Sequence, residues 1–241
     1  MIYQPRTYRS QHASPDLVSF TVSVKETNLF VSAQTNLERK THRLVLKYRG
    51  ILEKYIAGHP DFLTSLKPID VEADAPPIIR DMVQATRKAG VGPMASVAGA
   101  VAQFIGEELL DYSPDVIIEN GGDIYIKTTR DRVIGIYAGD SPLSGKIGLE
   151  IAPGDTPYGI CTSSGTVGHS LSFGKTDAVT IVAPSATLAD AVATACGNVV
   201  QTGDDIEQGL SIASKIASVK GAVIIAGDRI GAWGAVRLKR L

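Results

Sequence analysis

Cysteine, aromatic side chains and long apolar runs are scarce in this sequence, and each shortage excludes a class of protein. Only Cys161 and Cys196 occur among 241 residues, too few for a disulfide framework, and neither lies in a CxxC pair. Aromatic residues make up 6%, so the core is expected to consist of Ile, Val, Leu and Ala. No apolar run approaches the roughly 18 residues of a membrane helix, and residues 1–6 lack a signal-peptide pattern. We therefore expect a cytoplasmic protein that has no membrane partner.

Charge of one sign is also lacking, because 24 Lys and Arg are balanced by 25 Asp and Glu, for a net charge of −1. This balance argues against the basic footprint of a nucleic-acid-binding protein. The distribution is uneven: residues 1–50 carry eight basic and three acidic side chains, whereas residues 51–241 carry 16 and 22. We interpret this as a basic edge on an acidic body, with no nucleic-acid partner.

Hydrophobic periodicity predicts an α+β fold, with mostly antiparallel sheets packed against long helices of small residues. One domain over residues 1–241 is expected, with 1–76 as a candidate N-terminal subregion. Oligomeric state does not follow from the sequence, which is compatible with a homo-oligomer. The predicted helices are 35–58, 77–89, 93–110, 185–200 and 206–217, with a loop over 61–76. The predicted strands are 17–24, 27–33, 116–119, 124–127, 132–138, 146–151, 158–161 and 178–183, and 222–226 with 233–238 are expected to form a closing hairpin.

A glycine-rich stretch leads into the predicted helix 93–110. It reads Gly-Val-Gly-Pro-Met-Ala-Ser and contains Gly92, Ala95 and Ser96. The amides at a helix start have no helical partner and carry a partial positive charge, which suits a phosphate group. The alternative is a glycine–proline helix start packed against the sheet, and the stretch alone favours that structural interpretation.

Asp190 and Thr194 are four residues apart in a helical stretch that is otherwise small and apolar. At this spacing their side chains share one face of the helix. A carboxylate with a hydroxyl one turn later offers oxygen ligands to a hard cation such as Mg²⁺. The alternative is that Asp190 caps a turn or bonds a nearby amide.

Two loops have compositions that suit a ligand. The first, Asn120 to Asp123, is a tight turn whose backbone a flat ligand can approach closely. The second begins at Thr162, and its backbone amides are candidates for an anion nest. The unperturbed pKa of histidine suits general acid–base catalysis, which makes His169 in this loop a catalytic candidate, although a polar surface loop is an equal alternative. The candidate ligand-binding residues of the two loops are Asn120, Gly121, Gly122, Asp123, Thr162, Ser163, Ser164, Gly165 and Thr166.

The order of these segments resembles the ApbE-like superfamily, whose best-known members are FAD-dependent, magnesium-requiring protein flavinyltransferases. The resemblance spans about residues 90–200, and the chain as a whole resembles an uncharacterised branch of the superfamily. Its most specific parts are Asn-Gly-Gly-Asp at 120–123 and Asp-Ala-Val-Ala-Thr at 190–194.

The resemblance implies an α+β core with a flavin-nucleotide cleft and a bound magnesium ion. It places the metal on Asp190, Thr194 and, by position, the carbonyl of Ala95. It also maps a catalytic histidine onto His169. The implied cofactors are Mg²⁺ and FAD or a related flavin nucleotide, and a protein acceptor of FMN is an implied partner.

Several positions depart from the transferase pattern. Ser96 stands where the transferases carry a Lys, and residues 171–174 replace an Asp-Pro-x-Thr-Gly element. The segment between Thr-Ser-Gly and the loop histidine is also much shorter. These departures favour metal binding over flavinyl transfer. Three hypotheses therefore stay open: an enzyme that transfers FMN from FAD to a hydroxyl group, a non-catalytic flavin- or nucleotide-binding protein, and a structural or partner-binding module.

Overall fold

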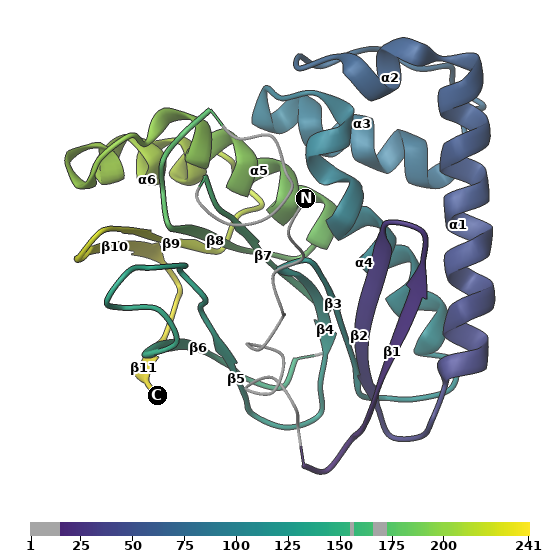
Figure 1. Ribbon diagram of the computed structural model, residues 1–241, viewed down its shortest axis with the longest axis horizontal. Coiled ribbons are helices and arrows are strands. Elements are labelled where there is room, and N and C mark those ends of the chain that lie inside the picture. Colours follow the sequence, from purple (N-terminus) through teal and green to yellow (C-terminus); the bar gives the residue numbers. More distant parts are fainter. Residues whose placement is uncertain (1–14, 155–156, 166–172) are drawn as a thin grey trace.

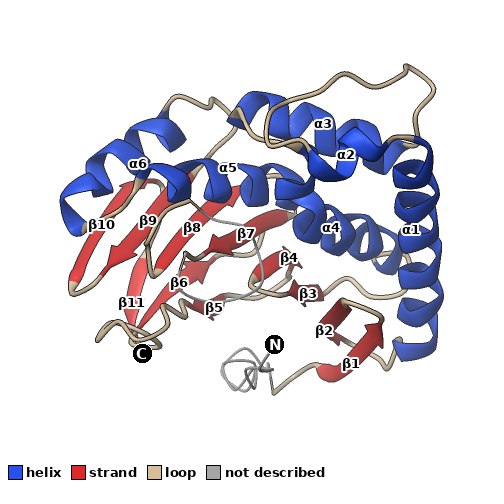
Figure 2. Cartoon of the chain, turned by 45° about the horizontal axis from the view of Figure 1, so that its top comes forward, coloured by secondary structure: helices blue, strands red, loops and turns tan. Residues whose placement is uncertain are grey.

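The structure, a computed structural model, describes residues 15–154, 157–165 and 173–241. Helices cover one face of a large antiparallel sheet, and a smaller sheet covers part of the other face (Figures 1 and 2). The large sheet has eight strands in the order β1-β2-β3-β4-β7-β8-β9-β10, and the small one has the order β11-β6-β5. This arrangement confirms the predicted α+β class with mostly antiparallel sheets.

The strands are short, and they pair both with neighbours in sequence, such as β1 with β2, and with distant segments, such as β2 with β3 and β6 with β11. Every pairing in both sheets is antiparallel. The strands are β1 (Val18–Val24), β2 (Thr27–Ala33), β3 (Val116–Asn120), β4 (Asp123–Lys127), β5 (Arg132–Gly135), β6 (Ile147–Ile151), β7 (Tyr158–Ser163), β8 (Ala178–Ala183), β9 (Gly221–Ala226), β10 (Arg229–Gly234) and β11 (Leu238–Arg240).

The helices pack on the sheet through small and aliphatic side chains. Helix α5 packs on β7 and β8, and α4 packs on β3, β4 and α5. The helices are α1 (Glu38–Gly58), α2 (Pro60–Thr64), α3 (Pro77–Ala89), α4 (Val97–Leu109), α5 (Ala186–Val199) and α6 (Ile206–Ser214), with short 3₁₀ helices η2 (Pro93–Ser96) and η3 (Gly203–Asp205).

Two apolar cores result from this layering. The larger core lies between the eight-stranded sheet and the helices, and the smaller one lies between the two sheets. Strands β8 and β9 are covered on both faces, and all their residues are buried. Their sequences therefore lack the apolar–polar alternation of a strand with one wet face.

Several predicted elements differ from the observed ones. The predicted loop 61–76 contains part of α2, whose proline at the first position suits a helix start. The predicted strand 132–138 ends at Gly135. The closing hairpin is formed by β9 and β10, whereas β11 pairs with β6 in the small sheet.

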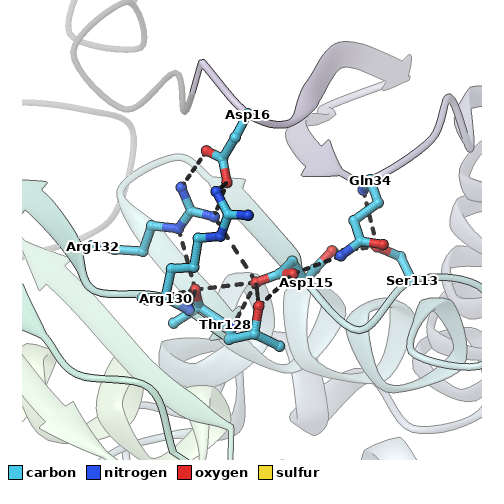
Figure 3. A network of polar contacts seen from close by, with 8 residues as sticks. Asp16, Gln34, Ser113, Asp115, Thr128, Arg130 and Arg132 are labelled. Atoms are coloured by element: carbon cyan, nitrogen blue, oxygen red, sulfur yellow. Dashed lines mark hydrogen bonds and ion pairs between the residues drawn. The ribbon is translucent and has the colours of Figure 1, made fainter.

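A partly buried polar network connects the segment before β1 to the strands beside it (Figure 3). Asp16 accepts two hydrogen bonds from the guanidinium of Arg132, at 2.6 and 2.9 Å. Asp115 accepts from the amide of Thr129 at 2.7 Å and from Gln34 Nε2 at 2.9 Å. The hydrogen bond from Arg132 lowers the pKa of Asp16 to about 2.

No single helix in the described ranges combines the length and apolarity that a membrane span needs; α3 and the η2–α4 segment meet the test only as a pair bent by 100°.

Candidate functional site

Asp190 lies on α5 with its carboxylate at the N-terminal end of α4. Its Oδ2 accepts a hydrogen bond from the amide of Gly99 at 2.9 Å, and the amide of Ala98 also donates to it. Both amides belong to the first turn of α4, where helical geometry leaves amides unpaired. The carboxylate of Asp190 thus accepts from amides at the start of α4, a few residues beyond the Gly92–Ser96 stretch that was predicted to face a phosphate.

The two helices approach closely enough for this contact because residue 99 is glycine. A Cβ at this position would lie 2.3 Å from the carbonyl oxygen of Ala186 and 2.8 Å from the Cβ of Asp190. Such distances are far below van der Waals contact. The small residues of α4 and α5 therefore serve to bring the two helices, and with them the carboxylate, together.

Asp123 begins β4 directly after a turn that requires glycine. Gly121 and Gly122 have φ angles of +70° and +108°, which side chains rarely adopt. The amide of Gly122 donates to Glu119 Oε1 at 2.9 Å, which fixes the turn from the preceding strand. Asn120 Nδ2 donates to the carbonyl of Ala98 at 3.0 Å and so ties the turn to the start of α4.

The carboxyl groups of Asp123 and Asp190 are buried and close enough to influence each other electrostatically. Burial raises the pKa of Asp190 to about 7, against the hydrogen bonds from Gly99 and Ala98 that favour its charged form. Burial and the charge of Asp190 raise the pKa of Asp123 well above its ordinary value. Within the described ranges, neither carboxylate is within ion-pair distance of a Lys or Arg. The pair therefore carries an uncompensated negative charge when both groups are ionised.

Cys161 lies on β7 opposite Asp123 in the strand pairing. Its thiol donates to the carbonyl of Ala186 at 3.3 Å, and burial together with the two carboxylates raises its pKa well above the ordinary value. The reactive form of cysteine is the thiolate, which this environment disfavours. Cys161 is therefore a packing residue beside the carboxylates and is not suited to act as a nucleophile.

The other two predicted metal ligands lie on α5 itself and in η2, the short helix directly before α4. Thr194 follows Asp190 by one turn of α5 and is partly exposed, as the i,i+4 spacing predicts. Ala95 lies in η2, immediately before Ser96, which is the N-cap of α4. Because the hydrogen-bond ladder of α4 begins with the Ser96 carbonyl, the carbonyl of Ala95 lies outside that ladder.

The remaining residues of the glycine-rich stretch have contacts of their own. Gly92 packs against the backbone of Ser65 and Leu66. Ser96 is fully buried, and its hydroxyl donates to the carbonyl of Pro93 at 2.9 Å. The assignment of Gly92 and Ser96 to ligand binding remains a prediction. In the structure both residues make packing or hydrogen-bond contacts within the segment that starts the helix.

The described part of the second loop continues β7. The amide of Thr162 donates to the carbonyl of Gly122 at 3.2 Å, and the amide of Gly165 donates to the carbonyl of Thr176 at 2.9 Å. The Thr162 hydroxyl lies 2.9 Å from that of Thr180, and Ser163 pairs with Val179 in the sheet. Ser164 Oγ lies 3.5 Å from the carbonyl of Thr176. Thr166 and His169 lie outside the described residues.

The fold thus joins Asp123, predicted to bind the nucleotide, to Asp190, predicted to bind the metal. Glu119 and Cys161 complete the cluster and were not predicted; a carboxylate directly after Val-Ile-Ile in a buried strand was the available signal for Glu119. Among the residues the structure describes, no three His, Cys, Asp or Glu side chains form a metal-binding group. The ligands predicted for the metal are one carboxylate, one hydroxyl and one backbone carbonyl, so only one of them is a side chain of those four types.

Comparison with known proteins places the chain in a family. The sequence profile of the family described as "AbpE bacteria" matches residues 9–222. The chain belongs to this family. A UPF0280 protein of Methanocaldococcus jannaschii is 42% identical over 221 residues, covering 89% of this chain and 90% of that protein. A UPF0280 protein of Methanococcus aeolicus is 42% identical over 224 residues, covering 89% of each.

Solved structures with the same fold carry the name ApbE. The flavinyl transferase ApbE of Pseudomonas stutzeri, in its apo form, matches with a TM-score of 0.60 and 14% identity over 90% of this chain and 93% of that chain. The flavin transferase ApbE of Vibrio cholerae matches with a TM-score of 0.55 and 14% identity over 91% and 97%. This AbpE-family chain therefore has the ApbE fold, which confirms the resemblance and the fold class expected from the sequence.

Proposed function

We propose that this protein binds a flavin nucleotide, FAD in the first instance, together with Mg²⁺, and transfers FMN from it to a hydroxyl group of a protein acceptor. The observation that supports this proposal most directly is the buried pair Asp123 and Asp190 at the start of α4. Burying an ionised carboxylate without a partner of opposite charge is costly. A bound cation provides that partner, so the pair fits a cation-dependent site.

The donor set around Asp190 suits a hard cation. Mg²⁺ prefers oxygen ligands and uses few from the protein, keeping water or taking phosphate oxygens at its other positions. The residues that would hold it are Asp190, Thr194 and the carbonyl of Ala95. Asp123 would add negative charge nearby without being assigned as a ligand. A magnesium ion bound there would supply charge neutralisation for the phosphates of a nucleotide.

The nucleotide is inferred from the family and from the names of the proteins that share the fold, two of which are called flavin or flavinyl transferases. In the proposed reaction the acceptor hydroxyl attacks the flavin-bearing phosphorus, the pyrophosphate bond breaks, and AMP leaves. His169 would accept the proton from the attacking hydroxyl. Asn120 and the Gly121–Gly122 backbone, beside the carboxylates, would line the nucleotide.

Flavin binding without transfer is the second candidate, and Ser96 favours it. The transferases that the sequence resembles carry a lysine at this position, whereas here the side chain is fully buried and its hydroxyl is bonded to Pro93. No cationic side chain reaches the site from this position. If that charge is required for transfer, the protein would bind a flavin nucleotide and leave it intact.

Calorimetry and product analysis on one protein sample test both candidates. We expect FAD to bind in the presence of Mg²⁺, and binding to weaken at least tenfold in Asp190→Asn, which keeps the shape of the side chain but loses its charge. The exposed Asp111→Asn serves as the matched control. Release of AMP on incubation with FAD and Mg²⁺ indicates transfer or hydrolysis, whereas binding without AMP supports the second candidate. Equal FAD affinity in the wild type and in Asp190→Asn contradicts the proposal.

A further inference from the structure

Phe173 is held at the C-terminal end of α5 by contacts to its backbone. Its amide donates to Asn198 Oδ1 at 3.1 Å, and its carbonyl accepts from Gln201 Nε2 at 2.8 Å. The next residue, Gly174, packs so tightly that a Cβ there would lie 1.8 Å from the carbonyl oxygen of Gly197. The position of the Phe173 backbone is therefore well determined by the helix.

The phenyl ring gains little from this arrangement. Phe173 is 58% exposed as a residue, the largest value among the exposed large hydrophobic residues of the described chain. Burial of an aromatic ring is a major source of stability, and here the fold fixes the residue without providing that burial. A planar aromatic surface held in place but left open is suited to stack on a planar ligand.

Asn198 relates this aromatic residue to the carboxylate site. Asp190, Thr194 and Asn198 follow one another at intervals of four residues on α5. Residues at this interval lie on neighbouring turns of the same side of a helix, and eight residues span about 12 Å along its axis. A flavin covers such a span when its phosphate lies beside Asp190, because the ribityl chain separates the phosphate from the ring system.

We propose that Phe173 stacks on the isoalloxazine ring of the flavin and selects for that half of the nucleotide. This inference rests on the proposed function, since it places the phosphates at Asp190. It assigns α5 two tasks: the Asp190–Thr194 turn holds the phosphate end through the cation, and Asn198 positions the aromatic surface that takes the ring.

The test uses FMN and ADP as separate probes, each with Mg²⁺ and the full-length protein. ADP contains the pyrophosphate but no flavin, whereas FMN contains the flavin ring but no adenine. We expect Phe173→Ala to weaken FMN binding about tenfold or more, as loss of a stacking aromatic does, and to leave ADP binding unchanged. Phe173→Leu, which keeps an apolar side chain but lacks the ring, should behave like Phe173→Ala.

Fluorescence gives an independent readout. An indole in contact with an excited flavin quenches its emission by electron transfer, so Phe173→Trp should strongly quench bound FMN. Tyr137→Trp, at another exposed aromatic position, is the matched control and should not.

The possible results separate this inference from the function on which it rests. If the wild type binds neither FMN nor FAD, the proposed function and the inference both fail. If the wild type binds FMN but Phe173→Ala binds it equally well and Phe173→Trp does not quench it, the inference alone is wrong. Weaker ADP binding in Phe173→Ala, with FMN binding intact, would assign the ring to adenine and overturn the inference.

Discussion

At the scale of single residues, the most unusual feature is the burial of Asp123 beside Asp190. The i,i+4 spacing of Asp190 and Thr194 was enough to predict that they share a helix face. The meeting of Asp123 with Asp190 was not predictable, because the two are 67 residues apart and meet only through the packing of α5 on the sheet. Sequence spacing reports neighbours within an element, whereas this cluster depends on contacts between elements.

The raised pKa values predict how stability changes with pH. The unfolded chain loses these protons near pH 4, whereas the folded protein retains the proton of Asp190 up to about pH 7. Between these values the native state binds more protons, so the contribution of the pair to the free energy of unfolding falls as pH rises. The slope is at most about 1.4 kcal/mol per pH unit for each group. In metal-free buffer, Asp190→Asn should therefore be more stable than the wild type at pH 8.

Denaturant unfolding from pH 5 to pH 8, with chelator present, measures this difference. The control is Asp111→Asn, which should follow the wild-type pH dependence because residue 111 is exposed. A constant difference in the free energy of unfolding between the wild type and Asp190→Asn across this range would show that the carboxyl group does not titrate as described.

At the scale of secondary structure, periodicity predicted most elements, and the exceptions have physical causes. The apolar repeat over 35–58 is observed as α1, and the stretch over 93–110 is helical but is divided between η2 and α4. The division lies just before the first turn of α4, whose amides donate hydrogen bonds to the carboxylate of Asp190. The three-residue β11 is too short to show alternation, which is why its pairing with β6 was missed.

Two glycine-to-alanine substitutions should have opposite effects on stability. In α4, Gly99→Ala forces a Cβ into the Ala186 carbonyl, and overpacking of this kind costs about 1–3 kcal/mol. In α1, Gly50 is exposed and has no atom within 4 Å of the added methyl group. Gly50→Ala should stabilise the protein by about 0.5–1 kcal/mol, because alanine favours the helix. Chemical denaturation measures both.

The two variants act as controls for each other, since each adds the same methyl group to a helix. Stabilisation by Gly99→Ala would mean that α4 and α5 do not approach as closely as the structure shows. In that case the hydrogen bond from the Gly99 amide to Asp190 would also be in doubt.

At the scale of the whole molecule, the large sheet brings together strands from the first and last thirds of the described chain, whereas the final strand, β11, lies in the small sheet. Strands β1 and β2 form one edge and β9 and β10 the other, with the carboxylate-bearing β4 between them. The network in Figure 3 fixes the start of β1 to the region of β3 and β5 through Asp16, Arg132 and Asp115. Helix α4 packs on β3 and β4, and α5 packs on β7 and β8, in the middle of this sheet (Figure 2). The carboxylates therefore lie between these two helices and the central strands.

The family was recognisable from the order of short motifs, and the antiparallel sheet from their surroundings. Strands β5 and β6 were predicted as well, but their separation into a second sheet with the three-residue β11 was not, because strand periodicity does not say which strands pair. The small sheet covers the second face of the large sheet, where the uniformly buried β8 and β9 need an apolar partner. This requirement is visible in the sequence only as a lack of alternation, and it does not identify the covering strands.

In the proposed function, a divalent cation on Asp190 and Thr194 binds the phosphates of the nucleotide. Crystals grown with Mn²⁺ and ADP test it most directly, because Mn²⁺ replaces Mg²⁺ at oxygen sites and scatters anomalously. The account predicts one strong anomalous peak within coordination distance of Asp190 and Thr194, with the diphosphate bound to the same ion. Nucleotide density with no such peak, or with the peak at other residues, would contradict it.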